Sequence, residues 1–306
     1  MSTEPAPRRT NLALRVLRLV AVAYLLVLLL MTMLERYLVY PAPPLSRGDW
    51  APAGDDYEDV WIDVPALKPS GEPTRVHGWY FDHPEPLDAV LYCHGNGEDI
   101  TFNLDLARHL RDELEAAVLL FDYRGYGKSV GKPHEAGLVA DGLAAQRWLA
   151  ERTARTPDQT VVIGRSLGGG VATAIAAEQG AQALVLQSTF SRMTDAAASH
   201  YPWLPVRWIM QNRYDSLARL AAYDGPVLIS HGDWDEVIPY EQGVRLFDTA
   251  PGKKRFVELP GRSHNQPQPG SYYPVLQEFL AESRIPLADT ALNGEATPSP
   301  AANPNE

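Results

Sequence analysis

The stretch "VVIGRSLGGGVATAIAA", residues 161–177, places one serine between a β-branched run and a row of glycines. Residues 161–163 predict a buried strand, and the small and apolar residues from 167 onward predict a helix. Ser166 therefore lies at a strand-to-helix turn. Gly164 and Gly168 flank it at two-residue spacing, where so sharp a turn leaves no room for a Cβ atom. Such a turn presents the hydroxyl clear of the sheet.

Short β-rich runs alternate with helical runs on both sides of this turn, between residues 57 and 286. Such alternation is typical of an α/β domain, with a mostly parallel sheet and helices on both of its faces. The first two strands are expected to form an antiparallel pair. We expect further strands at 89–95, 117–123, 183–188, 226–232 and 255–260, and helices at 101–116, 135–153, from 240 and from 272.

The carboxyl ends of the strands are where an active site forms in such a sheet, and candidate partners for Ser166 follow them. A serine hydroxyl needs a base to take its proton and a carboxylate to hold that base in the right tautomer. Of the eight histidines, only His264 follows the last strand in a loop before the closing helix. The acid should follow the preceding strand, and we select Asp235 over Asp233 and Glu236 because its position lets the carboxylate turn back toward the site.

The segment "YCHGNGED", residues 92–99, ends another strand beside the predicted nucleophile. Its backbone N–H groups around Asn96 can form an oxyanion hole together with the N–H of Leu167. We interpret His94 as a structural residue that orients this loop, with a second base as the alternative. Cys93 precedes the loop within an apolar strand and is interpreted as a core residue.

Five motifs in this order carry a family resemblance, namely "HGNG", "DYRGYGKS", "GRSLGGG", "HGDWDEVIP" and "GRSHN". Over residues 57–286 the chain resembles the α/β-hydrolase fold superfamily. With its single apolar N-terminal segment, it is similar in particular to membrane-anchored α/β-hydrolase-domain proteins. The resemblance implies a serine hydrolase in which Ser166 is the nucleophile, Asp235 the acid and His264 the base. It also implies that no metal or cofactor is needed.

Residues 188–224 form an insertion of about 37 residues where a plain crossover needs far fewer. We expect a small cap over the site. Tyr201, Trp203 and Trp208 are candidates to line an acyl-chain pocket within it. The alternative is that these aromatic residues only hold the cap against the sheet.

The net charge of −11 and the lack of a basic stripe or a zinc-binding spacing argue against a nucleic-acid partner. Cys93 is the only cysteine, which excludes a disulfide within the chain. The expected partners are therefore a small-molecule or lipid ester and, through the N-terminal segment, a membrane.

Residues 12–34 are almost entirely apolar and, as a helix of about 34 Å, are long enough to cross a bilayer. We interpret them as an uncleaved transmembrane anchor, with a cleaved signal peptide as the alternative. Four arginines precede the uncharged part of this segment and only two follow it closely, which places residues 1–11 in the cytoplasm and the main domain outside it. The 5 lysines against 22 arginines favour a GC-rich bacterial source, and hence the periplasmic side.

The remaining segments are a Pro-rich tether at 41–56, expected to be extended rather than packed, and a disordered tail at 287–306. The complete chain is thus predicted to be a membrane-anchored serine hydrolase that cleaves carboxylic esters, lipid-like or other acyl esters, through an acyl-enzyme. A serine peptidase on the same scaffold and a catalytically idle membrane scaffold are the alternatives.

Overall fold

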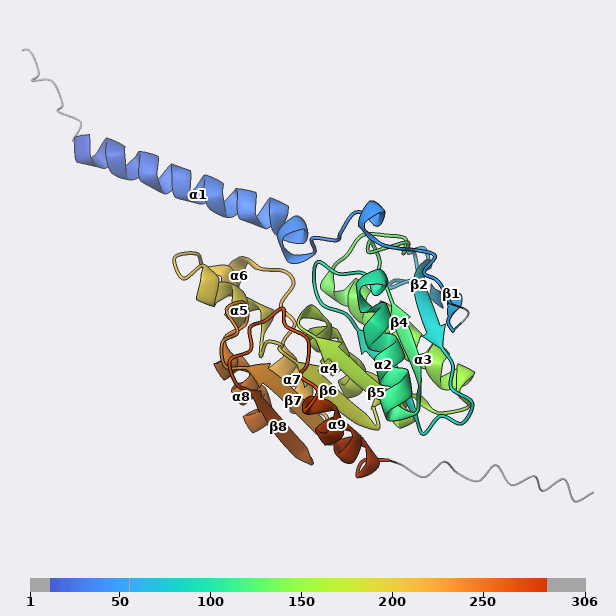
Figure 1. Ribbon diagram of the computed structural model, residues 1–306. Coiled ribbons are helices and arrows are strands. Elements are labelled where there is room, and N and C mark those ends of the chain that lie inside the picture. The colour runs from blue at the N-terminus through green and yellow to red at the C-terminus, as the bar shows by residue number, and fades with distance from the viewer. Residues whose placement is uncertain (1–11, 55, 285–306) are drawn as a thin grey trace, which may run out of the picture.

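The computed structural model describes residues 12–54 and 56–284, and its centre is an eight-stranded sheet (Figure 1). The strand order is β1-β2-β4-β3-β5-β6-β7-β8. β1 and β2 pair antiparallel, β2 runs antiparallel to β4, and all the other pairs are parallel. The strands are β1 Glu58–Val64, β2 Thr74–Phe81, β3 Asp88–Cys93, β4 Ala116–Phe121, β5 Val161–Arg165, β6 Ala183–Gln187, β7 Val227–Gly232 and β8 Lys254–Leu259.

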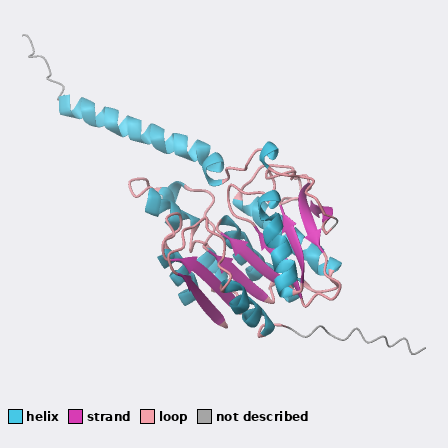
Figure 2. Cartoon of the chain, in the orientation of Figure 1, coloured by secondary structure: helices cyan, strands magenta, loops and turns pink. Residues whose placement is uncertain are grey.

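Helices cover both faces of this sheet, as Figure 2 shows. Two of them, α2 (Leu104–Leu114) and α9 (Tyr272–Ala281), bury their apolar residues against one face. The other face is covered by α3 (Glu135–Arg152), α4 (Leu167–Gln179), α7 (Ser216–Leu220) and α8 (Tyr240–Thr249). The predicted fold class is confirmed, because the central strands are fully buried runs between two helical layers.

The turn from β5 into α4 has the backbone conformation that its glycines require. Ser166 has φ 51° and ψ −118°, a sparsely populated combination for a residue with a side chain. A Cβ atom on Gly168 would collide with the main-chain oxygen of Cys93, and one on Gly164 would collide with that of Gly168. The strand and the helix therefore approach each other more closely than any larger residue would permit.

The N-terminal helix α1 spans Leu12–Val39 and projects from the body of the molecule (Figure 1). It continues five residues past the predicted end at Leu34, because the following residues pack against the cap. A stretch of 18 residues within α1 has a mean hydropathy of 2.5, which is sufficient for a membrane span. A signal sequence near an N-terminus would meet the same criterion.

The segment that follows α1 differs from the extended tether expected for residues 41–56. Tyr40 is buried, and Pro44 leads into a short 3-10 helix, Leu45–Arg47. The Trp50 ring then lies against His77 and Trp79 of β2. The reason is that its one aromatic residue, Trp50, packs against aromatic side chains of the sheet, so this segment lies on the domain instead of separating it from α1.

The insertion between β6 and β7 contains α5 (Met193–His200), α6 (Val206–Ile209) and α7. Of these, α5, α6 and the loops around them form the cap, which lies at the carboxyl ends of the strands and below α1 in Figure 1. The predictions for residues 1–11 and for the tail at 287–306 fall outside the described residues.

Gly168→Ala tests the close approach of α4 to β3. Because the new methyl group meets backbone atoms that cannot move aside, we expect the midpoint of thermal unfolding, Tm, to fall by about 5–10 °C. Gly270→Ala is the control, because nothing lies within 4 Å of a Cβ atom at that position. Circular dichroism of the full-length protein in detergent measures both, and equal Tm values for the two variants would contradict the steric argument.

Candidate active site

Ser166, His264 and Asp235 are joined by hydrogen bonds at the carboxyl ends of the strands. Nε2 of His264 lies 3.0 Å from Oγ of Ser166, and its Nδ1 lies 2.8 Å from Oδ2 of Asp235. A carboxylate only accepts, so Nδ1 carries the hydrogen and Nε2 is free to accept the proton of the serine hydroxyl. The structure thus brings together three residues predicted from β5, from the loop after β7 and from the loop after β8.

The Asp235 carboxylate is held by more than His264. Its Oδ1 accepts hydrogen bonds from the N–H groups of Val237 at 2.9 Å and Ile238 at 2.7 Å. Burial by itself would raise the pKa of this carboxyl group, but hydrogen bonds from His231, His264 and the backbone outweigh burial and hold the pKa well below its ordinary value. Asp235 is therefore an anion at neutral pH, as the stabilisation of an imidazolium requires.

His231 is a partner of Asp235 that the sequence analysis missed. It lies on β7, is fully buried, and places Nε2 3.3 Å from Oδ2 of Asp235 and 2.9 Å from the carbonyl oxygen of Ile238. Because a carbonyl only accepts, Nε2 carries the hydrogen and points into the loop that holds the acid. In the sequence, its place near the end of a strand and four residues before Asp235 could have indicated this contact.

Asp233 and Glu236, the two carboxylates not selected as the acid, lie in the same loop after β7 as Asp235. Asp233 accepts a hydrogen bond from the N–H of Gly261 at 2.5 Å, which ties the loop after β7 to the loop after β8. Glu236 receives a hydrogen bond of 3.4 Å from the N–H of His264. Neither carboxylate has a hydrogen bond to the His264 ring within the described residues, so their contacts are with the backbone that positions the ring.

The loop after β3 lies beside Ser166, since a Cβ atom on Gly95 would be 3.6 Å from that of the serine. Both polar atoms of the Asn96 side chain form hydrogen bonds. Its Nδ2 donates to the carbonyl of Val39 at 2.6 Å, and its Oδ1 accepts from the hydroxyl of Tyr126 at 2.8 Å. In the described part of the chain its main-chain N–H has no protein partner. Together with the N–H of Leu167 at the start of α4, it is available to an oxyanion.

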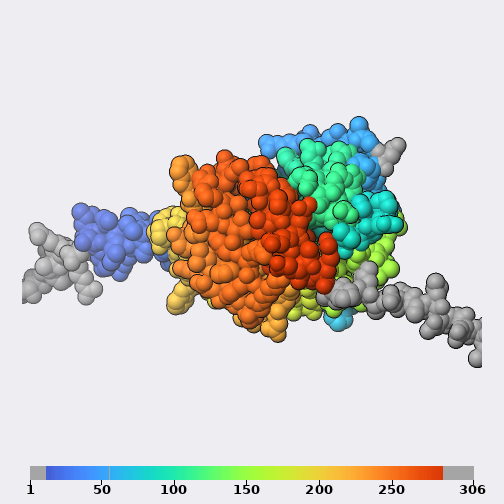
Figure 3. Space-filling model, turned by 60° about the horizontal axis from the view of Figure 1, so that its bottom comes forward, coloured from blue at the N-terminus to red at the C-terminus, as the bar shows by residue number. Residues whose placement is uncertain are grey.

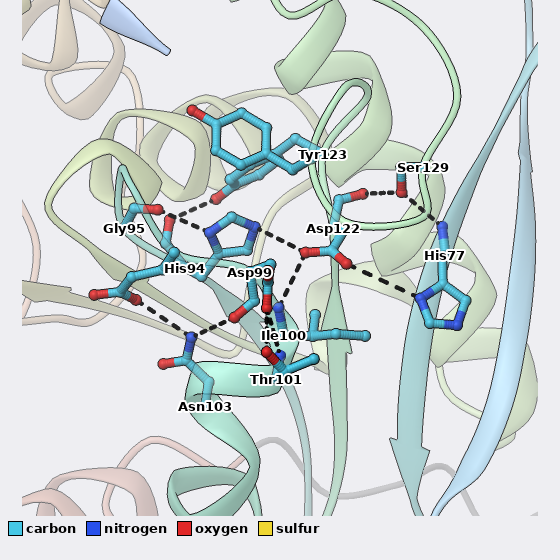
Figure 4. A network of polar contacts seen from close by, with 12 residues as sticks. His77, His94, Gly95, Asp99, Ile100, Thr101, Asn103, Asp122, Tyr123 and Ser129 are labelled. Atoms are coloured by element: carbon cyan, nitrogen blue, oxygen red, sulfur yellow. Dashed lines mark hydrogen bonds and ion pairs between the residues drawn. The ribbon is translucent and has the colours of Figure 1, made fainter. Parts of the chain in front are cut away.

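A buried polar network connects the loop after β3 to neighbouring segments (Figure 4). His94 donates from Nδ1 to the carbonyl of Gly95 at 2.8 Å and places Nε2 3.6 Å from Oδ1 of Asp122. Asp122 also accepts from the N–H of Ile100 at 3.0 Å, and burial raises the pKa of its carboxyl group. Oγ of Ser129 donates to the Asp122 carbonyl at 2.7 Å and accepts from the N–H of His77 at 2.8 Å, which connects the loop after β4 to β2. These contacts fit the structural role expected for His94.

The neighbouring Cys93 is fully buried in β3. Burial raises the pKa of its thiol well above the ordinary value, so the thiol is neutral and is not a nucleophile. Within residues 12–54 and 56–284, no three His, Cys, Asp or Glu side chains are grouped as a metal ion would require.

Arg165 holds the loop that carries His264. It lies 2.9 Å from Oε1 of Glu98 and donates to the carbonyl oxygen of His264 at 3.0 Å. The guanidinium group thus connects β5, the loop after β3 and the loop after β8. This role was not predicted, because the Arg in "GRSLG" has no partner that the sequence alone identifies.

A cavity of about 470 Å³ opens above Ser166 and His264. Tyr201 lines it as predicted, but Trp203 and Trp208 do not: their side chains are 60% and 87% exposed on the cap surface. The prediction that the two tryptophans line an acyl pocket is therefore wrong. The reason is that the loop before α6 and the exposed face of α6 turn these rings outward. Residues from the end of α1 line the cavity in addition, among them Met31, Thr32 and Leu38.

Comparisons with known proteins agree with this architecture. The family model described as the alpha/beta hydrolase fold matches residues 88–219. An uncharacterized protein of Mycobacterium tuberculosis is 38% identical over 261 residues, which cover 84% of this chain and 89% of that protein. Protein bem46 of Schizosaccharomyces pombe is 34% identical over 216 residues, covering 67% of this chain and 71% of that protein.

Solved structures show the same fold at lower identity. An esterase from Pyrococcus furiosus superposes with a TM-score of 0.64 at 20% identity, over 79% of this chain and 96% of that one. This likeness concerns the arrangement of the elements, not the substrate. The family model and the extent of the sequence matches, together with the sheet order and the serine turn, show that the chain belongs to the α/β-hydrolase fold family.

Proposed function

We propose that the protein is a serine hydrolase that cleaves carboxylic esters through an acyl-enzyme intermediate. The observation that carries this proposal is the unbroken series of hydrogen bonds from Ser166 Oγ through the His264 ring to the Asp235 carboxylate. A serine held in a strained backbone conformation at this place is otherwise difficult to explain, since such strain costs about 1–3 kcal/mol.

The reaction has two halves. Oγ of Ser166 attacks the ester carbonyl while its proton moves to Nε2 of His264, and the resulting oxyanion accepts hydrogen bonds from the N–H groups of Leu167 and Asn96. The carbonyl re-forms, the bond to the alkoxy group breaks, and His264 returns the proton so that an alcohol leaves. Water then attacks the acyl-serine with the same base, and the carboxylic acid is released.

Asp235 and the buried surroundings make these steps favourable. The carboxylate keeps the His264 ring in the tautomer that accepts at Nε2, and its negative charge stabilises the imidazolium formed in each half-reaction. The N–H donors are fixed by α4 and by the Asn96 side chain, so little reorganisation is needed when the oxyanion forms.

The cavity supports an apolar acyl group as the part of the substrate that is recognised. Its lining is mainly aliphatic and aromatic on the side of the cap, where Phe190, Met193, Leu204, Val206 and Ile209 contribute. Tyr201 of the cap and Ile238 of the acid loop complete this wall.

The proposal includes anchoring of the protein in a membrane by α1. The segment between Leu19 and Leu34 has no charged residue, and Arg15 and Arg18 lie within reach of one headgroup layer. The excess of arginine before this segment supports a cytoplasmic N-terminus and a catalytic domain on the opposite side of the membrane.

Ser166→Ala tests the nucleophile. We expect labelling by a fluorophosphonate probe to disappear and kcat/KM for a p-nitrophenyl ester to fall at least about 10³-fold, because no other oxygen can form the acyl-enzyme. Ser271→Ala, at an exposed serine before α9, is the matched control and should keep both properties. Labelling that persists in Ser166→Ala would overturn the assignment, and a faster turnover of a matched p-nitroanilide would indicate a peptidase.

His231 is expected to act as a positioning residue for Asp235. Replacement by Phe removes the Nε2 donor, so kcat should fall about 10- to 100-fold while KM changes little. His231→Gln, which keeps a donor on a shorter side chain, should recover part of this loss. Steady-state kinetics, with circular dichroism to verify folding, measure the effect; full activity of a folded His231→Phe would show that the other hydrogen bonds hold Asp235 on their own.

The orientation of the protein can be measured in a bacterial host. We expect the full-length chain to stay in the membrane pellet after extraction with alkaline carbonate, because about 16 uncharged residues of α1 are held in the bilayer. Protease added to spheroplasts should then digest the catalytic domain. Release of the protein by carbonate would indicate a cleaved signal peptide, and protection from protease would reverse the proposed orientation.

A further inference from the structure

One face of α1 is turned toward the catalytic domain. Along the second half of this helix, the positions of reduced exposure are Leu28, Met31, Thr32, Glu35, Arg36 and Val39. Their spacing of three or four residues places them in one stripe along the helix. The other faces are open, as at Met33, whose side chain is 71% exposed. The helix is therefore packed against the domain on one side only.

A buried carboxylate holds this helix at a fixed angle to the cap. Oε1 of Glu35 accepts hydrogen bonds of 2.8 Å from both the main-chain and the side-chain nitrogen of Asn212, and of 3.0 Å from the N–H of Gln211. Next along the chain, the Tyr40 hydroxyl donates to Oδ1 of Asn212 at 2.8 Å and lies 2.9 Å from the hydroxyl of Tyr214. A charged group buried with this many donors makes the junction between α1 and the domain specific.

A second contact places the cap far along the apolar part of α1. The hydroxyl of Tyr24 donates to the carbonyl oxygen of Trp203 at 2.9 Å. Tyr24 is eleven residues before Glu35, a distance of about 16 Å along the helix axis. Tyr24 also lies within the uncharged segment that begins at Leu19. The cap loop around Trp203 therefore lies beside the apolar length of α1, and lipid that surrounds this helix would also contact the loop.

The cap surface exposes large aromatic side chains next to α1. Trp203 and Trp208 are exposed by 60% and 87%, and Tyr201 by 44%. Tryptophan and tyrosine are the residues preferred where protein meets the boundary of a bilayer. Arg207, the charged residue of α6, is 59% exposed, and its guanidinium group is paired with Asp195 at 2.7 Å. Figure 3 shows cap atoms, in yellow, directly against the blue helix, so the two form one continuous surface.

The cavity above Ser166 reaches this junction. Its lining includes Met31 and Thr32 of α1 together with Ile209 and Met210 of the cap. The same cavity is lined by Ser166 and His264. The wall of this cavity is therefore built in part from α1.

We propose that the cavity opens sideways into the bilayer between α1 and the cap, and that the substrate is an acyl ester resident in the membrane. Its acyl chain passes between Met31 and Met210 to reach Ser166, while the exposed rings of Trp203 and Trp208 hold the cap in the lipid beside α1. This inference rests on the proposed function, because it names the substrate class and the route to the same catalytic serine.

Two methionines of α1 allow a matched test of this route. Met31 lines the cavity, whereas Met33 lies on an open part of the helix. We expect Met31→Trp to narrow the passage, so that the ratio of kcat/KM for a long-chain ester to that for a short-chain ester falls at least about tenfold. Met33→Trp should leave this ratio unchanged. Both are measured on the full-length protein in phosphatidylcholine vesicles, with the long-chain ester placed in the vesicle membrane.

The outcomes separate the two proposals. Equal ratios in Met31→Trp and Met33→Trp, with normal fluorophosphonate labelling of Ser166, would overturn the sideways route and leave the hydrolase proposal intact. No turnover of either ester and no labelling of the unmodified protein would overturn the proposed function itself.

The depth of the cap has an independent measurement. Vesicles of phosphatidylcholine brominated on the acyl chain quench the fluorescence of tryptophans that enter the lipid. Trp208→Phe should reduce the quenched fraction of the full-length protein, whereas Trp61→Phe, at a residue of the edge strand β1, should not. Identical quenching in the two variants would place the cap in water, as would be the case for a surface that binds a soluble partner or a second copy of the chain.

Discussion

The contact between the Ser166 hydroxyl and the His264 imidazole is the interaction on which the site depends. It joins residues 98 positions apart in the chain, at a distance of 3.0 Å. It exists only because β5 ends in a turn too tight for side chains at Gly164 and Gly168, and because Arg165 holds the His264 loop by its carbonyl. The strain at Ser166 is thus balanced by packing that is spread over several strands.

Much of this arrangement could be predicted, because it follows from local requirements. The fold class follows from the alternation of strands and helices, and it is confirmed. Two glycines at a fixed spacing around Ser166 predict the turn. The positions of Asp235 and His264 follow from the rule that loops at the carboxyl ends of parallel strands lie close together. Each of these inferences needs only a few neighbouring residues and the order of elements.

The features that were missed or wrongly predicted depend on contacts between distant segments. His231 had no visible role until β7 and the loop after it brought its ring to Asp235. Composition suggested that Trp203 and Trp208 face inward, but both side chains lie exposed on the surface of the cap. The packing of residues 41–56 depends on Trp79, a residue of β2 that no local pattern connects to Trp50. Periodicity contains no information about such pairs.

The Glu35 carboxylate has a consequence for any shortened form of this protein. A chain that begins after residue 40 would lose the acceptor for Asn212 and Gln211, the hydroxyl of Tyr40 and the carbonyl that receives the Asn96 amide. Donors beside the oxyanion loop would then be left without partners, and the cavity would be open along one side. Selectivity measured on such a fragment would describe a cavity that lacks part of its wall, because α1 contributes residues to the lining.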